Sequence, residues 1–129
     1  GEHVRGYIGE LRADIEALRN SNAEGFGRTA EQCEAALDDL EETTGFLLDA
    51  LAGGRQQEAL AAATPYLRLF SLAAGGAYLV RGALAGRDGG RVALARFFAE
   101  NLLAETGALK SRVTGGAASL AAAGAALAS

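Results

Sequence analysis

The sequence has few of the residues that cross-link or interrupt a polypeptide chain. Cys33 is the only cysteine, which excludes an internal disulfide and makes a reducing, cytoplasmic location the expectation. Pro65 is the only proline, and this scarcity favours long helices over an all-β fold rich in turns. Aromatic residues make up 6% of the 129 residues although 50% are apolar, so much of the apolar surface must come from small side chains that suit closely packed helices.

Lysine and histidine are equally scarce. The net charge is -4, Lys110 is the only lysine, and Lys and Arg are too dispersed to follow a phosphate backbone, so nucleic acid is not an expected partner. His3 is the only histidine, and with a single cysteine it cannot complete a zinc site or a Ser-His-Asp or Cys-His arrangement. Glu100 and Glu105 are expected on a polar helix flank, where a surface role is favoured over acid-base work. We therefore predict no catalytic, cofactor or metal site in these residues.

Two further absences concern the beginning of the sequence. Methionine is missing, even at position 1, which predicts that residues 1–129 are a fragment of a longer chain. A secretory signal is not expected either, because Glu2, Arg5 and Glu10 interrupt the apolar segment that export would need. The length is that of one domain, and we expect a single helical domain over 1–129.

Apolar residues recur at spacings of three and four in four separate segments, which is the pattern of amphipathic helices. The predicted helices span about 2–19, 29–52, 56–85 and 89–114 or beyond, and residues 115–129 form an Ala/Gly-rich tail with helical turns to about Ala123 and frayed residues after it. The second segment is the clearest, with a heptad seam of Ala30, Cys33, Leu37, Leu40, Thr44, Leu47 and Leu51. Because the connections are short, we predict an all-α fold, an up-down-up-down antiparallel four-helix bundle.

The third segment is so apolar that a membrane, a protein core and a partner surface are all possible surroundings. Between positions 59 and 80 the only charged residue is Arg68, and from Leu67 onward apolar residues surround the helix axis. Gly75 and Gly76 each cost about 1 kcal/mol relative to alanine, so they are expected where another backbone comes close. Arg68 and Pro65 both fall inside the only window near membrane-spanning length. We expect no membrane span, and instead a central core helix or one packed against a partner.

Pro65 leaves two local structures open for this segment. Either one helix from about Gln56 to Ala85 is kinked at Pro65, or a short helix ends there and a new one begins with Thr64 as N-cap. The alanine-rich stretch "RQQEALAAA" supports helix right up to Thr64 and favours the kinked helix.

Three groups of residues could contact something outside the helices. The large aromatic residues outnumber what one narrow seam can hide, so some are expected at an interface with a second protein: Tyr66, Phe70, Tyr78, Phe97 and Phe98. The turn "GRDGGRV" offers backbone amides and two guanidinium groups to an anion through Arg87, Gly89, Gly90 and Arg91, although a turn capped by Asp88 explains the same residues. The acidic face of the second helix is expected to be solvated: Glu31, Glu34, Asp38, Asp39, Glu41 and Glu42.

The second half of the sequence resembles the helical C-terminal extension of FAD-dependent acyl-CoA dehydrogenases. The similarity is to the larger bacterial branch that includes methylmercaptopropionyl-CoA dehydrogenase-like enzymes, and the start "GEHVRGYIGEL" resembles the helix that joins the catalytic body to this extension. The residues that carry it are Pro65, Tyr66, Leu67, Leu69, Phe70, Gly75, Gly76, Tyr78, Arg91, Ala95, Phe97, Phe98, Leu102, Leu103 and Glu105. The sequence departs from the pattern at Ser71, at Ala77-Tyr78 and at Ala104, where Gly, Trp and Pro are common.

The resemblance implies a parent enzyme that removes two hydrogens across the α,β bond of an acyl-CoA thioester, with a Glu base and FAD as hydride acceptor. In such enzymes the base sits in a Tyr-Glu-Gly-Thr-type segment, which does not occur in these 129 residues. The expected role is therefore an accessory domain without its own cofactor, packed on the catalytic body or on the neighbouring subunit of a homo-oligomer. A free-standing helical bundle that acts as an interaction or scaffold module is the alternative.

Overall fold

The computed structural model describes residues 2–21, 25–86 and 88–128, and these residues form helices without a strand. The helices are α1 (Glu2–Ser21), α2 (Thr29–Ala52), α3 (Gln56–Gly86), α4 (Gly89–Asn101) and α5 (Thr106–Ala128), with a 3-10 turn, η1 (Leu103–Glu105), between the last two. The prediction of an all-α fold is confirmed.

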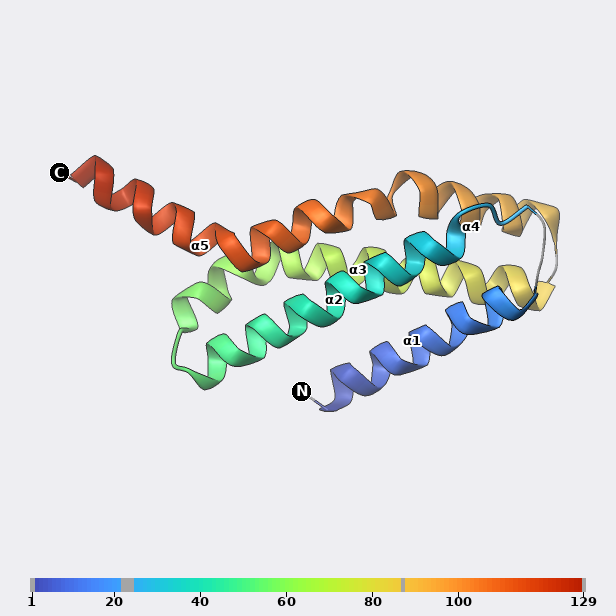
Figure 1. The fold of residues 1–129 in the computed structure, drawn as a ribbon, viewed down its shortest axis with the longest axis horizontal. Coiled ribbons are helices and arrows are strands. Elements are labelled where there is room, and N and C mark those ends of the chain that lie inside the picture. The colour runs from blue at the N-terminus through green and yellow to red at the C-terminus, as the bar shows by residue number, and fades with distance from the viewer. Residues whose placement is uncertain (1, 22–24, 87, 129) are drawn as a thin grey trace.

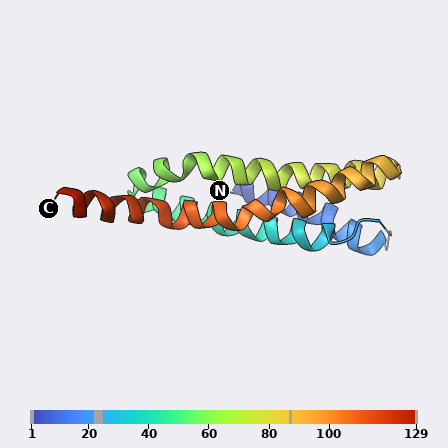
Figure 2. The same ribbon diagram turned by 90° about the horizontal axis from the view of Figure 1, so that it is seen from above.

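The helices form an elongated bundle with α3 at its centre (Figures 1 and 2). α3 contacts α1, α2, α4 and α5, whereas α1 contacts only α2 and α3 among the described residues. α1, α2 and α3 run in alternating directions, and α4 and α5 together run back along α3 in one direction (Figure 1). The fold is thus organised around one apolar helix, as expected for the third segment.

The predicted number of four helices is wrong. The segment 89–114, predicted as one helix, is divided between two helices, α4 and α5. α4 ends at Asn101 and α5 begins at Thr106. At this break the Asn101 side chain donates a hydrogen bond to the Phe97 carbonyl at 3.0 Å, and the Thr106 hydroxyl donates one to the Leu103 carbonyl, also at 3.0 Å. The Leu103 carbonyl also accepts the Thr106 backbone amide, so these side-chain hydrogen bonds add to the backbone bonds at the break.

Pro65 lies inside α3 and does not break it, because the helix is continuous from Gln56 to Gly86. Ala62 before the proline and Leu69 after it are both buried in the core, at 2% and 0% exposure. Burial of both flanks anchors the helix to the core on either side of the proline and offsets the lost backbone hydrogen bond. The alternative of a new helix beginning at Thr64 is not observed.

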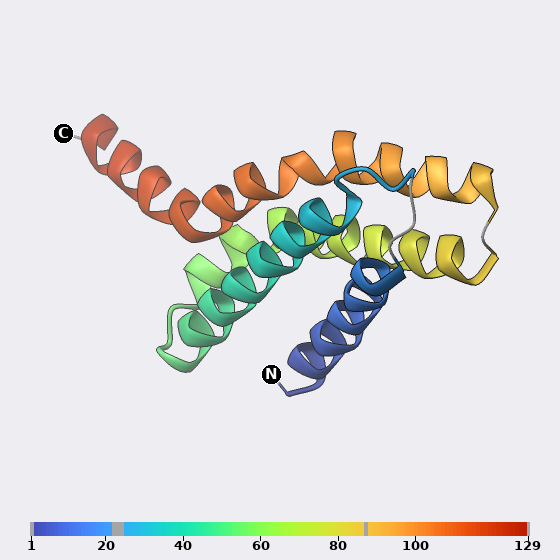
Figure 3. The ribbon, with the colours of Figure 1, turned by 45° about the vertical axis from the view of Figure 1, so that its right-hand side comes forward.

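The Ala/Gly-rich tail is helical to Ala128, which is further than the expected end near Ala123. Its last turns project beyond the connection between α2 and α3 (Figures 1 and 3), and residues 118–128 are exposed.

The sequence predicts that another backbone comes close to Gly75 and Gly76. In the structure the atoms nearest to these glycines belong to side chains of other helices. A Cβ atom placed on Gly76 would lie 3.0 Å from Cδ1 of Leu103 and 3.6 Å from Sγ of Cys33. A Cβ atom on Gly75 would lie 3.3 Å from Cζ of Phe98. The two glycines form a notch in α3 that receives Leu103 and Phe98, and this notch fixes where α4 and η1 lie on the core.

Among the described helices, α3 alone is long and apolar enough to cross a membrane. A core helix passes the same test, and α3 is surrounded by four other helices. Arg68 on its exposed side forms an ion pair with Glu105 at 2.8 Å. These contacts are those of a core helix.

The acidic face of α2 is not simply solvated, because most of its carboxylates pair with cations of neighbouring helices. The pairs join α2 to α1 through Arg12–Asp38, Arg12–Glu41 and Arg19–Glu34, and to α5 through Lys110–Asp39 and Lys110–Glu42. The hydrogen bond from Arg19 lowers the pKa of Glu34. Exposed pairs of this kind contribute little stability each, so their main effect is to set the register of α1 and α5 on α2.

Cys33 should be unreactive in the folded protein, because it is 2% exposed and burial raises its pKa from 9.0 to about 12. We expect a thiol-specific reagent at mildly alkaline pH to label Cys33 at least a hundredfold more slowly in the native chain than in the unfolded chain. Because the pKa of Cys33 is about 9 in the unfolded chain and about 12 in the folded chain, the unfolded chain loses the thiol proton first. The free energy of unfolding should therefore fall as pH rises from about 9 towards about 12. Fast labelling without denaturant would contradict the buried position.

An apolar docking surface on α4

Helix α4 is set in place by its N-terminal cap and by small buried residues. The Asp88 carboxylate accepts a hydrogen bond from the Gly90 amide at 2.9 Å, which begins the helix. Ala95 and Ala99 are 2% and 0% exposed, and their small size lets α4 lie close against the core.

The opposite side of α4 exposes large apolar side chains. Leu94 and Phe97 on α4 are 52% and 61% exposed, Leu102 directly after the helix is 38% exposed, and we call these three residues the α4 face. Leu94 and Phe97 are one helical turn apart and lie on the same side. Apolar residues of this size, gathered on a helix surface, are typical of a protein-protein contact.

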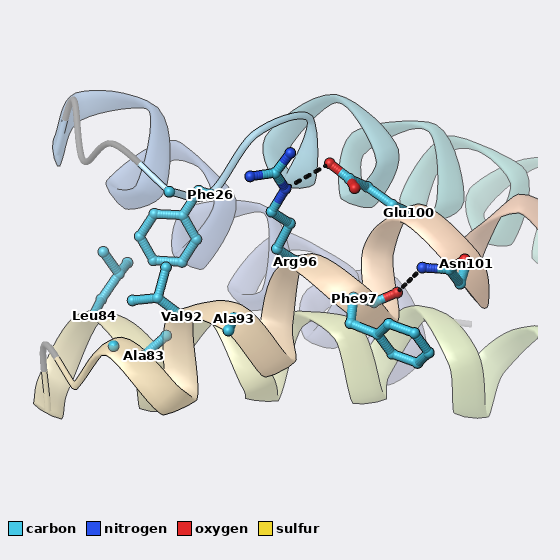
Figure 4. A pocket seen from close by; sticks show the side chains of 11 residues that line it. Phe26, Ala83, Leu84, Val92, Ala93, Arg96, Phe97, Glu100 and Asn101 are labelled. Atoms are coloured by element: carbon cyan, nitrogen blue, oxygen red, sulfur yellow. Dashed lines mark hydrogen bonds and ion pairs between the residues drawn. The ribbon is translucent and has the colours of Figure 1, made fainter.

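Beside the α4 face the surface is hollowed into an open pocket of about 710 Å³. Its apolar lining comes from three parts of the chain: Phe26 before α2, Ala83 and Leu84 at the end of α3, and Val92, Ala93 and Phe97 on α4. Figure 4 shows Phe26 facing Val92, with Arg96 and Glu100 at one rim and Asn101 bonded to the Phe97 carbonyl.

The polar rim is already paired within the chain. Glu100 Oε1 accepts hydrogen bonds from Arg96 Nε at 3.0 Å and from the Arg28 backbone amide at 3.4 Å. The bond from the Arg28 amide, followed by that from Arg96, lowers the pKa of Glu100. Gly27 has a φ of 55°, which side chains rarely adopt, and a Cβ atom there would lie 2.7 Å from Arg96 Nε, so a larger residue would strain the backbone and displace the Arg96 side chain. These hydrogen bonds join α4 to the residues that precede α2, so the rim has a structural role. The apolar lining of the pocket is therefore the part that is available to a partner side chain.

The structure separates the five aromatic residues that the sequence offers as interface candidates. Tyr66 and Phe70 are half-buried: the Tyr66 hydroxyl is 2.8 Å from Oγ1 of Thr44, and the Phe70 ring stacks on Tyr7 at 5.8 Å. Tyr78 is 50% exposed, and its hydroxyl accepts a hydrogen bond from the Tyr7 hydroxyl at 2.7 Å.

Phe98 packs against the notch at Gly75, whereas its neighbour Phe97 is the most exposed of the five. Leu94 and Leu102 also belong to this surface, and Phe26 lies beside it, although none of the three is among the interface residues predicted from the sequence. Phe26 is the one large apolar residue in the turn "NSNAEGFGRT", and this position alone indicates that its side chain packs against a helix.

The candidate anion site at the start of α4 is occupied by the protein itself. Arg87 lies outside the described residues. The Asp88 carboxylate binds the Gly90 amide, and its negative charge disfavours an anion at the same helix end. The Arg91 guanidinium lies against Gly86, where a Cβ atom would be 2.9 Å from Nη1. Gly89 and Gly90 are explained as parts of a capped turn.

Within 2–21, 25–86 and 88–128, no group of three or more His, Cys, Asp or Glu side chains is placed to hold a metal ion. The α4 face and the pocket beside it form an apolar surface with no charged residue at its centre. Fold and surface together define an all-helical domain suited to packing against another protein surface.

Comparison with known families identifies this domain. The family described as acetyl-CoA dehydrogenase C-terminal like matches residues 7–123, and the chain belongs to this family. No curated protein and no solved structure matches the chain.

Proposed function

We propose that the chain is the accessory C-terminal helical domain of an FAD-dependent acyl-CoA dehydrogenase, and that it packs through the α4 face on the catalytic body or on a neighbouring subunit. The observation that carries this proposal is Phe97, which is 61% exposed beside an apolar pocket in a chain of this family. Residues 1–129 then act as one helical domain.

The chemistry in this proposal belongs to the rest of the enzyme. The parent would be a cytoplasmic, homo-oligomeric flavoprotein that dehydrogenates an acyl-CoA thioester at its α,β bond, in the methylmercaptopropionyl-CoA dehydrogenase-like branch. The domain itself would hold no FAD and no catalytic residue. Its resemblance to that branch at Pro65, Tyr66 and Phe70 supports the assignment, and these residues pack within the domain.

The α4 face has the composition of an interaction hot spot. A phenylalanine that is half or more exposed can bury a large apolar area without losing much side-chain freedom. The apolar pocket beside Phe97 offers room for a reciprocal side chain from the partner. The neighbouring charges are already paired, so docking would not bury an uncompensated charge.

A binding measurement with a paired control tests the proposal. We expect Phe97→Asp to weaken binding of the 129-residue chain to the acyl-CoA dehydrogenase catalytic body of the same organism at least tenfold, measured by calorimetry, because a charge replaces the central apolar anchor. Leu60→Asp, at an exposed leucine on α3, should leave this affinity unchanged.

The same titration can contradict the proposal. If the wild-type chain does not bind the catalytic body, or if Phe97→Asp binds as tightly as the wild type, docking through the α4 face is wrong. Binding to an unrelated protein through Phe97 would instead support the free-standing interaction module. Circular dichroism should show the same helix content for both variants, because each replaced side chain is mostly exposed.

A further inference from the structure

A second apolar surface lies at the other end of the molecule from the α4 face. The end of α2 and the start of α3 enclose a groove of about 430 Å³ whose lining contains no charged residue. Its most exposed members are Leu51, Leu60 and Leu67, at 55%, 74% and 63%. The remaining apolar lining comes from Leu47, Ala59, Ala63 and the ring of Tyr66, and we call this feature the α2–α3 groove.

The end of α5 is a matching apolar element at the same end of the bundle. Residues 118–128, which we call the α5 tail, contain no charge and extend past the α2–α3 connection (Figure 3). Leu120 and Leu127 are its large side chains, at 71% and 88% exposure. All residues of the tail are exposed.

The leucines of the groove and of the tail have the same spacing. Leu60 and Leu67 are seven residues apart on α3, and Leu120 and Leu127 are seven residues apart on α5. Seven residues are close to two helical turns, or about 10.5 Å, so each pair lies on one side of its helix. Alanines follow Leu60 at positions 61–63, and residues 121–126 between Leu120 and Leu127 are all alanine or glycine, so small side chains permit close approach of the two axes there.

We propose that two copies of this chain form a symmetric dimer in which the α5 tail of each copy lies in the α2–α3 groove of the other. The tail cannot reach its own groove as a straight helix, because it points away from the bundle (Figure 1). A two-fold axis perpendicular to the long axis of the bundle brings the two like ends together. Each tail then runs beside α3 of the second copy, with Leu120 nearest Leu60 and Leu127 nearest Leu67.

The available surface is of the size that a stable dimer needs. Each copy contributes five exposed leucines, which are Leu51, Leu60, Leu67, Leu120 and Leu127. At roughly 100 Å² of apolar surface for each leucine, the ten side chains of two copies reach about the 1,000 Å² expected of a specific interface. Two ion pairs beside the groove are already formed within the chain, Arg55–Glu58 at 2.9 Å and Arg68–Glu105 at 2.8 Å, and the groove lining itself contains no charged residue.

This inference does not rest on the proposed function. The groove and the tail lie at one end of the bundle, whereas the α4 face lies towards the other (Figure 1). A dimer can therefore form whether or not the domain docks on a catalytic body, and each surface can be altered alone.

Sedimentation equilibrium of the full 129-residue chain over a concentration series tests the dimer. We expect Leu127→Asp in the tail and Leu60→Asp in the groove each to raise the dimer dissociation constant about 100-fold, because every substitution acts twice in a symmetric interface. Leu94→Asp, on the α4 face and also exposed, should leave the constant unchanged.

Mixing the two variants gives the sharpest result. A copy with Leu127→Asp keeps an intact groove, and a copy with Leu60→Asp keeps an intact tail, so the mixture restores one complete contact. We expect the mixture to form heterodimers at concentrations where each variant alone is monomeric. A wild-type chain that stays monomeric, a dimer unaffected by both substitutions, or a mixture that does not associate would each overturn the proposal.

Discussion

Replacing Leu69 with alanine should lower the free energy of unfolding by about 2–5 kcal/mol, measured by urea denaturation. Leu69 is 0% exposed and lies on α3, the helix that every other long helix contacts. Removal of its side chain leaves a cavity that the surrounding helices cannot fill, because each of them is also held by its own contacts.

Leu94→Ala is the matched control for this prediction, because it removes the same atoms from a helix surface. Leu94 is 52% exposed, and we expect its loss to change stability by less than about 1 kcal/mol. If both variants unfolded at the same urea concentration, α3 could not be the centre of the core.

Replacing Leu103 with alanine should also cost about 2–5 kcal/mol, and a second substitution should recover part of the loss. Leu103 is 2% exposed and fills the notch at Gly76. In the Leu103→Ala background, Gly76→Ala should stabilise by about 1 kcal/mol or more, because it adds a methyl group to the vacated space and has the higher helix propensity.

In the wild-type background the same Gly76→Ala change should gain less, because its Cβ atom meets Cδ1 of Leu103 at 3.0 Å. The four proteins of this double-mutant cycle, compared by thermal unfolding, should therefore be non-additive. Additive effects of the two substitutions would mean that Leu103 does not occupy the notch.

The helices themselves could be predicted because periodicity reports burial on one face. The seam from Ala30 to Leu51 appears as α2, which the structure bounds at Thr29–Ala52. The choice at Pro65 was harder, because proline permits both a continuous helix and a restart. Burial of Ala62 and Leu69 on either side decides it, and such tertiary packing is not encoded in local propensity.

The break between α4 and α5 could not be read from the apolar spacing. The three-four pattern continues without interruption from Val92 to Val113, so a single helix fits it. What ends α4 is a combination of the Asn101 and Thr106 side-chain hydrogen bonds and the insertion of Leu103 at Gly76. The last of these contacts joins residues far apart in the sequence.

The docking surface was predictable only in part. Phe97 and Phe98 were both candidates by residue type, but adjacent helix positions point about 100° apart and one of the two had to be covered. Only the placement of Gly75 shows that Phe98 is the covered one. Leu94 is exposed because Ala95 and Ala99 form the side of α4 that packs on the core.

The restricted contacts of α1 determine how the domain can open. α1 is held by α2 and α3 alone among the described residues, partly through the Arg81–Asp14 and Arg12–Asp38 ion pairs. Helices with few neighbours are the first to exchange their amide hydrogens. A transient detachment of α1 would leave Leu94, Phe97 and Leu102 in position, so the docking that we propose at α4 would tolerate partial unfolding of the first helix.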